Sequence, residues 1–312
     1  MSVLIAGSIA LDNLRTPFGS RNYVLGGSAV HASLAASFFS PVEIVGVVGE
    51  DFPKEHLDFL NSKGINTNGI KVLKGKTFHW EGFYEYDMNM AHTLRTDLNV
   101  LASFDPVLLP EQKKTPYIFL ANLDPDIQMK ILAQLENKSL VVADTMNYWL
   151  ENKKPSLLKL ISMVDILVIN DMEARELTQE PNLIKAAQII LGYGCKYVII
   201  KKGEHGALLF SNKFAFSAPS HPQTELVDPT GAGDSFAGAL IGYLSAVKDI
   251  NFESLKKAVI IGSVIASFCV EDFSIERTKN LTKKEILMRY SSMRENVAFG
   301  DIESNLIKEG GF

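Results

Sequence analysis

Val227-Asp228-Pro229-Thr230-Gly231-Ala232-Gly233-Asp234-Ser235-Phe236-Ala237-Gly238-Ala239-Leu240 is the stretch of sequence that decides the fold. We interpret residues 225–227 as the end of an extended segment, and the residues from Gly231 onward as a turn that opens directly into a helix. Apolar residues in that helix recur at helical spacing, namely Phe236, Leu240, Tyr243, Leu244 and Val247. The sequence therefore predicts that Gly231 and Gly233 lie at a helix N-terminus.

This predicted terminus has the features of an anion site. A helix N-terminus carries unpaired backbone N–H groups and a partial positive charge of roughly half a unit, and glycines let a phosphate approach closely. Asp234 is unexpected there, because a carboxylate repels an anionic ligand. A base that takes a proton from an incoming hydroxyl would explain it. The structural alternative is a first-turn acid favoured by the helix dipole, beside glycines that only make a tight turn.

Composition and charge limit the classes of function. The chain has 312 residues, of which 46% are hydrophobic and 21% charged, enough for one large α/β domain with a substantial core. The formal net charge of -5 and the pI of about 5.7 argue against nucleic-acid and membrane partners. The N-terminal segment does not resemble a signal peptide. We therefore expect a single cytoplasmic domain over residues 1–312.

From residue 117 onward, apolar strand-like segments alternate with helical ones, which predicts parallel βαβ units. We expect a Rossmann-like three-layer α/β/α domain with a mostly parallel central sheet. In such sheets, ligands bind at the carboxyl ends of the strands. Polar residues close these strands repeatedly: Asn122 and Asp124, Asp144 and Asn147, Asn170 and Glu173, and Lys201, Lys202 and Gly203. Any one of them is also explained as a helix cap.

Residues 75–100 differ in character from the rest of the chain. They contain an aromatic, strand-like stretch of near-alternating polarity, which predicts a small sheet apart from the main one. Together with residues 13–24, this sheet would form a lid that excludes water from the site. An ordinary packed hairpin is the alternative. An exposed lid sheet favours a homodimer, and residues 295–312 are expected to form a mobile tail or an intersubunit arm.

The full string from Asp228 to Gly238 resembles the C-terminal signature of the ribokinase-like (PfkB) carbohydrate kinase family. The resemblance extends over most of the chain. Asn170-Asp171-Met172-Glu173 is similar to that family's Asn-x-x-Glu element, and the glycine pair Gly26-Gly27 before a small-residue helix is similar to its sugar-binding segment. These matches imply a ribokinase-like fold and ATP-dependent phosphorylation of a sugar hydroxyl.

The resemblance also implies roles for individual residues. Asp234 is the expected catalytic base, with the amides of Gly231, Ala232 and Gly233 as the anion hole. Substrate contacts are expected from Asp12, Gly26, Gly27, His31 and Asn122. Nucleotide contacts are expected from Asn170, Lys201, Gly203, Gly206, Thr230 and Gly233. Glu173 is expected to organise Mg²⁺ through water, and Asp228 marks a family-level site for a monovalent cation, K⁺.

Departures from the family pattern concern the substrate more than the reaction. Family members that bind free pentoses usually carry Asn where this chain has Ala10 and His31, so the acceptor need not be ribose. Lys201-Lys202 replaces the more usual Thr-Leu and places a cation near the nucleotide phosphates. A nucleoside kinase is the alternative, because the aromatic stretch 78–86 would stack on a base. A non-catalytic nucleotide-binding regulatory protein is more remote, since Asp234 and the Asn170/Glu173 element are intact.

Overall fold

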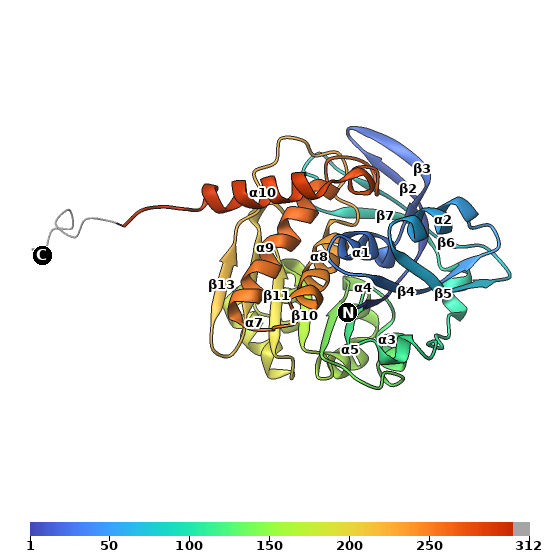
Figure 1. The fold of residues 1–312 in the computed structure, drawn as a ribbon, viewed down its shortest axis with the longest axis horizontal. Helices are drawn as coiled ribbons and strands as arrows, with labels where there is room; N and C mark the ends of the chain where they lie inside the picture. The colour runs from blue at the N-terminus through green and yellow to red at the C-terminus, as the bar shows by residue number, and fades with distance from the viewer. Residues whose placement is uncertain (302–312) are drawn as a thin grey trace, which may run out of the picture.

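The computed structural model describes residues 1–301 and, within them, a large and a small β-sheet (Figure 1). The large sheet has nine strands in the order β13-β12-β11-β10-β9-β8-β1-β4-β5. Its strands pair in parallel from β5 to β11, and β12 and β13 add antiparallel pairs at one edge. The bounds are β1 (Val3–Ala6), β4 (Val42–Gly49), β5 (Ile65–Leu73), β8 (Tyr117–Leu120), β9 (Leu140–Asp144), β10 (Ile166–Asn170), β11 (Tyr197–Lys201), β12 (Ala207–Phe210) and β13 (Ala215–Ala218).

Helices cover both faces of this sheet. Side chains of α1, α2, α8 and α9 share one core with one face, and those of α3, α5, α6 and α7 share a second core with the other. The helices are α1 (Ser28–Ser37), α2 (Lys54–Ser62), α3 (Pro125–Leu132), α4 (Asn147–Asn152), α5 (Lys154–Ile161), α6 (Asp171–Thr178), α7 (Leu183–Gly192), α8 (Ala232–Val247), α9 (Phe252–Cys269) and α10 (Lys283–Asn296), with 3₁₀ turns η1 (Asn99–Ser103), η2 (Gln112–Lys114), η3 (Gly203–His205) and η4 (Thr278–Asn280).

The central strand β1 shows why its sequence is apolar throughout. Val3 and Ile5 point into the first core, whereas Leu4 and Ala6 point into the second, and all four residues are fully buried. A parallel strand covered on both faces needs apolar residues at every position. The expected three-layer α/β/α architecture with a mostly parallel sheet is therefore confirmed.

Glycines let α8 lie against α1 with the two backbones in close contact. A Cβ atom on Gly238 would stand 2.1 Å from the Ala32 carbonyl oxygen, and one on Gly242 would stand 2.8 Å from the same atom of Ala36. Both distances are shorter than any real contact, so only glycine allows this approach. The close packing brings the first turns of the two helices together, which matters for the site.

The small sheet has the order β3-β2-β6-β7. Its strands are β2 (Ala10–Thr16), β3 (Gly19–Gly26), β6 (Phe78–Tyr84) and β7 (Ala91–Asp97). Two antiparallel pairs are joined by the parallel pair β2–β6, so the sheet is not a single hairpin. The predicted small sheet is confirmed, with its first segment beginning three residues earlier than expected because β2 follows β1 almost directly.

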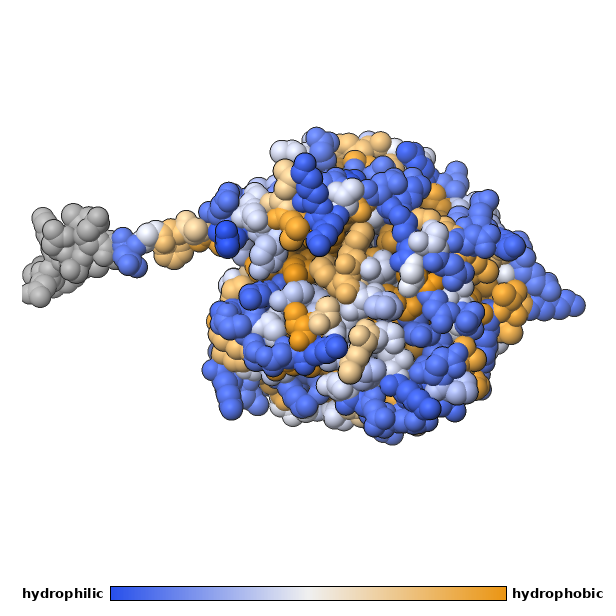
Figure 2. Space-filling model, viewed as in Figure 1, coloured by the Kyte–Doolittle hydropathy of each residue, from blue (hydrophilic) through white to orange (hydrophobic). Residues whose placement is uncertain are grey.

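Other segments differ from the expectations. Residues 225–227 form no strand, because β13 ends at Ala218 and an irregular loop leads from there to α8. The predicted tail begins inside α10, which continues to Asn296, and residues 302–312 lie outside the described part of the chain. Among the helices of residues 1–301, none has the length and apolarity to cross a membrane. Figure 2 shows polar residues over most of one face, with apolar residues scattered among them.

Candidate active site

A tight turn formed by residues 229–232 precedes α8. The Ala232 N–H donates to the Pro229 carbonyl at 3.1 Å, and Gly231 has φ 78° and ψ 0°. These angles are those of the third residue of a type II turn, a position that glycine occupies without strain. A Cβ atom on Gly231 would also lie 2.3 Å from Nδ1 of His31. Glycine is therefore required at 231 for both its backbone angles and its neighbour.

The turn leaves backbone N–H groups free at the start of α8. Within residues 1–301, the N–H groups of Gly231, Gly233 and Asp234 have no hydrogen-bond acceptor, as the first turn of a helix normally leaves them. Ala232 was expected among the anion-binding amides, but its N–H is engaged by Pro229. The amides available to an anion thus run from Gly231 through Gly233 to Asp234.

Asp234 occupies the first turn of α8 with a perturbed carboxyl group. Burial and, to a lesser extent, the negative charge of Asp144 raise its pKa to about 7, although the ammonium of Lys201 opposes the rise. A carboxyl group of this pKa is half ionised near neutrality, so it can both accept and release a proton there. This behaviour suits a general base better than a solvated helix-dipole acid.

Lys201 and Asp144 form an ion pair at the carboxyl edge of the large sheet. Lys201 Nζ donates to Asp144 Oδ2 at 2.9 Å, and the two side chains are 18% and 5% exposed. The pair spans β11 and β9 across the end of β10. From the sequence, Asp144 was identified only as one of several polar residues at strand ends, because sequence spacing does not show which strand ends lie together.

Asn170 and Glu173 cap α6 reciprocally. The Glu173 N–H donates to Asn170 Oδ1 at 2.8 Å, and the Asn170 N–H donates to Glu173 Oε2 at 3.0 Å. The helix-cap explanation therefore holds for both residues. Burial also raises the pKa of Glu173 to about 7, against the opposing charge of Lys201. Within residues 1–301, no hydrogen bond involves the other oxygen, Oε1, which remains open to a ligand.

The fit of these residues to Mg²⁺ is indirect. The part of the chain described here has no group of three or more His, Cys, Asp and Glu side chains able to hold a metal ion. Mg²⁺ usually keeps several waters and takes only one or two carboxylates in nucleotide sites. The open oxygen of Glu173 fits that mode, in which the protein contacts the ion through water.

Asp12 lies on the small sheet, in strand β2. Its Oδ2 stands 2.0 Å from where a Cβ of Gly26 would be, so only glycine fits at 26. Oδ1 is buried without a hydrogen-bond partner. Burial, followed by the charge of Asp228, raises the pKa of Asp12 to about 8. Gly27 is the N-cap residue of α1 and has φ 95°. A Cβ atom on Gly27 would stand 2.5 Å from the Ser8 carbonyl oxygen.

His31 lies in the first turn of α1, against Gly231. It is 2% exposed, and both ring nitrogens are buried without a partner. Burial lowers its pKa to about 4, so the ring is neutral at pH 7. Unpaired polar atoms inside a protein are rare and call for a partner such as water or a ligand. Asp12 and His31 therefore both carry buried polar atoms without a hydrogen-bond partner.

Comparison with known proteins assigns the family. The family model described as pfkB family carbohydrate kinase matches residues 11–279. The chain belongs to the pfkB family of carbohydrate kinases. It is therefore a phosphotransferase with an alcohol group as acceptor.

Individual relatives of this pfkB kinase include nucleoside and sugar kinases. It is 32% identical over 249 residues to a cytidine kinase of Thermococcus kodakarensis, covering 78% of this chain and 88% of that protein. A mouse ribokinase is 38% identical over 112 residues, 33% of this chain and 34% of that protein. A solved structure of Burkholderia thailandensis nucleoside kinase in complex with inosine superposes with a TM-score of 0.77 at 19% identity, covering 93% and 97% of the two chains. A putative ribokinase II from E. coli in complex with ATP and Mg²⁺ has a TM-score of 0.76 at 19% identity, covering 95% and 99%.

Asn122 follows β8 in this pfkB kinase, but its side chain is already engaged. Oδ1 accepts from the indole N–H of Trp149 at 2.8 Å, and Nδ2 donates to Met146 Sδ at 3.0 Å. Its carbonyl oxygen accepts from the Ser28 hydroxyl at 3.2 Å, next to the glycine pair. The Asn122 side chain therefore fixes the indole of Trp149. Sequence reasoning missed Trp149, and no local motif marks it.

Asp228 and Thr230 fix the loop before α8. The fully buried Asp228 carboxylate accepts the N–H groups of Thr230 and Ser274, each at 2.9 Å. The Thr230 hydroxyl lies 3.4 Å from the Tyr84 hydroxyl of β6, so the small sheet contacts the loop directly. Gly203 and Gly206 lie in the loop after β11, with φ 53° and 84°.

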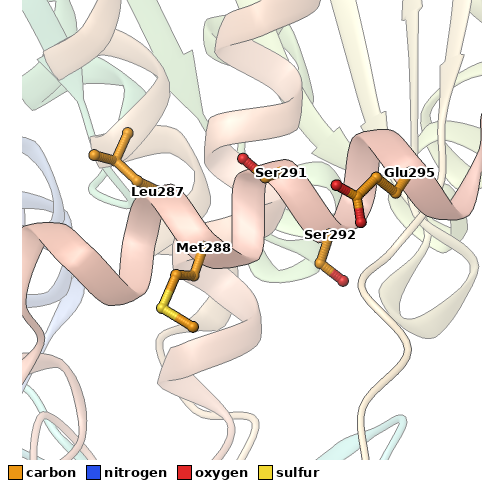
Figure 3. Close-up of a pocket in the computed structure, with 5 residues that line it drawn as sticks. All are labelled: Leu287, Met288, Ser291, Ser292 and Glu295. Atoms are coloured by element: carbon orange, nitrogen blue, oxygen red, sulfur yellow. The ribbon is translucent and has the colours of Figure 1, made fainter.

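A shallow hollow elsewhere on the kinase does not belong to this site. It lies on the surface of α10 (Figure 3), and the residues that line it are Leu287, Met288, Ser291, Ser292 and Glu295. None of the candidate site residues is among them. The chemistry described above is therefore concentrated at the start of α8 and the carboxyl ends of the strands.

Proposed function

We propose that this kinase transfers the γ-phosphoryl group of ATP to a hydroxyl group of a nucleoside, with Asp234 as the base. The observation that carries the proposal is the position of Asp234 at the start of α8, beside unpaired amides. A phosphate bound by those amides would have the carboxylate next to it, where an acceptor hydroxyl must lose its proton.

The proposed reaction assigns one task to each group. The Asp234 carboxylate takes the proton from the acceptor hydroxyl while the oxygen of that hydroxyl bonds to the γ-phosphorus. The bond from that phosphorus to the β,γ-bridging oxygen breaks, and its electron pair leaves with ADP. The amides of Gly231 and Gly233 stabilise the negative charge on the moving phosphoryl group. Glu173 would hold Mg²⁺ through water when the ion is bound, and the ion would then neutralise the nucleotide phosphates.

Unpaired polar groups support a polyhydroxyl acceptor. Asp12 Oδ1 and both ring nitrogens of His31 are buried without hydrogen-bond partners, and ribose hydroxyls would provide such partners. The cytidine kinase relative, matched over 78% of this chain, favours a nucleoside. A free sugar is the second candidate, favoured by the ribokinase relative over a shorter stretch.

The test is ADP release from Mg·ATP with a panel of nucleosides, pentoses, hexoses and sugar acids. Asp234→Asn is expected to lower turnover about 10²–10⁴-fold while ATP binding is retained. Glu253→Gln is the matched control, since Glu253 is also a first-turn helix acid, in α9, but pairs with Lys256 beyond the opposite end of α8. Near-normal turnover in Asp234→Asn would remove the base. Tight ATP binding without transfer to any acceptor would instead favour a regulatory protein.

A potassium site near Asp228 and Thr230 stays a prediction from the sequence. Both oxygens of Asp228 accept backbone N–H groups, so we route no step through a cation there. Comparing rates in sodium, potassium and choline salts tests it. Selective activation by potassium would support the site, and equal rates would remove it.

A homodimer formed through the small sheet is a further proposal. Strand β7 is one edge of that sheet, and Leu94 on it is 54% exposed. Edge strands with exposed apolar residues tend to pair with another chain. Light scattering is expected to give twice the chain mass, and Leu94→Lys is expected to restore the mass of one chain. A monomeric wild-type protein would contradict the proposal.

A further inference from the structure

Lys201 ends strand β11 at the edge where the site lies. Its register partner on the neighbouring strand is Asn170, and its side chain passes the end of that strand to reach Asp144 on β9. The side chain is 18% exposed, so its ammonium is largely withdrawn from water. Burying a charge in this way is costly unless the charge is paired and hydrogen-bonded.

The ammonium lies directly against the first turn of α8. A Cβ atom on Gly233 would stand 2.9 Å from Lys201 Nζ, and 3.7 Å from Cε. Gly233 therefore leaves room for the lysine as well as for a phosphate. Because the unpaired amide belongs to Gly233 itself, a cation and a free N–H donor lie close together at the start of α8.

The ammonium keeps unused donor capacity. A lysine ammonium has three N–H donors, and within residues 1–301 the only hydrogen-bond partner of Nζ is Asp144 Oδ2. The other oxygen of Asp144 accepts the Thr145 N–H at 2.8 Å, which fixes the carboxylate. Burial lowers the pKa of Lys201, but the negative charges of Asp144 and Glu173 outweigh this and raise it. Lys201 is thus a charged, positioned donor.

We propose that Lys201 is a catalytic residue whose ammonium contacts the phosphoryl group during its transfer, while Asp144 holds the lysine in place. The inference rests on the proposed function and deepens it. As the acceptor oxygen bonds to the γ-phosphorus, the bond to ADP breaks and the proton passes to Asp234. Negative charge builds on the oxygens of the phosphoryl group as it passes from ADP to the acceptor. A cation already in position stabilises this charge without rearrangement.

A contact made in the transition state has a distinct kinetic signature. Lys201→Met keeps the length of the side chain and removes its charge. We expect kcat to fall about 10²–10³-fold, with KM for ATP changed much less. Lys201→Arg is expected to recover part of the loss, because it restores a cation with different geometry.

Lys196→Met is the matched control. Lys196 lies just before the opposite end of β11 and forms a second Lys–Asp pair, with its Nζ 2.7 Å from Asp165. It is remote from the carboxyl edge of the sheet, so its variant is expected to keep wild-type kcat. A comparable loss of kcat in both variants would show that any such ion pair merely supports the fold, and would overturn the proposal.

A binding measurement separates the transition state from the ground state. ADP with aluminium fluoride imitates the phosphoryl group in transit when the best acceptor of the panel is present. Lys201→Met is expected to weaken this complex about 10²-fold and ADP alone by a few-fold at most. Equal weakening of both would overturn the proposal. If Lys201→Met does not fold, Lys201→Met with Asp144→Asn removes both charges, and near-normal kcat in that double variant would also overturn it.

The two proposals fail in different ways. If the wild-type kinase transfers phosphate to no acceptor of the panel, the proposed function fails before Lys201 is examined. If the wild type and Lys196→Met turn over while Lys201→Met matches them, the proposed function stands and only the role of Lys201 falls.

Discussion

Protonation of Asp234 should limit activity on the acid side of neutrality. Burial, together with the charge of Asp144, raises the pKa of this carboxyl group to about 7, whereas the ammonium of Lys201 opposes the rise. Only the ionised carboxylate accepts the proton of the acceptor hydroxyl. We therefore expect kcat/KM to be full above the pKa and to be lost as the pH falls through about 7.

The size of the effect follows from the titration. One pH unit below its pKa an acid is about one tenth ionised, and one unit above it about nine tenths, so kcat/KM should fall about tenfold from pH 8 to pH 6. An unperturbed Asp titrates near 3.9 and would give a flat profile over this range. The profile thus distinguishes a base with a raised pKa from an ordinary first-turn acid.

The assay is kcat/KM for the best acceptor across this range, at constant ionic strength and saturating Mg·ATP. Asp144→Asn removes the neighbouring negative charge and should move the acid limb to lower pH, because Asp144 raises the pKa of Asp234. A profile that stays flat to about pH 5, where an ordinary Asp is still ionised, would refute the reasoning. An acid limb that does not move in Asp144→Asn would refute the electrostatic coupling.

Three further predictions follow from the same geometry. Gly231→Ala should lower kcat about 10²-fold, because the added Cβ would displace His31. Gly64→Ala is the control for backbone strain alone, since Gly64 has a similar φ of 76° and no atom within 4 Å of an added Cβ. Equal effects of the two variants on thermal stability and kcat would contradict the clash. The pKa of Asp12 is raised from 3.8 to about 8, so the folded kinase keeps a proton that the unfolded chain loses. The stability that this gives at low pH is lost as the pH rises through 8. Thermal unfolding of the unliganded kinase against pH should show the loss, and Asp12→Asn should flatten the dependence. Tyr84→Phe removes a hydroxyl 3.4 Å from the loop before α8 and should raise KM for the acceptor about fivefold, as measured by steady-state kinetics; an unchanged KM would contradict the contact.

Local patterns predicted much of the fold. Alternation of apolar strands and helices after residue 117 indicated the parallel sheet, and Gly231 and Gly233 indicated the start of α8. These features depend on periodicity and backbone freedom, which neighbouring residues determine. The polar strand ends were likewise visible, and the structure brings Asp144, Glu173 and Lys201 together at one edge.

Long-range pairing escaped the sequence. Asp12 was expected to contact substrate, but nothing near it in the sequence showed that it lies in β2, a strand that pairs with β6 far along the chain. Asn122 was expected to contact substrate, yet its amide holds Trp149 and Met146. The Ala232 amide was expected to be free, and a turn bond occupies it. The positions of Asp12 and Asn122 depend on which distant groups meet, and no local spacing encodes that. The turn bond of Ala232 is local, because Pro229 is only three residues away.

The parallel pairing of β2 with β6 also has a consequence for how the chain folds. Leu11 faces His79 across that pair, 68 residues away, and the intervening chain builds β4 and β5 of the large sheet. Closing so long a loop is entropically unfavourable until the intervening strands are in place, so the small sheet should assemble late. Asp12 lies on β2, so it is part of this small sheet. A partly folded chain, in which β2 and β6 have not yet paired, therefore lacks an assembled acceptor side.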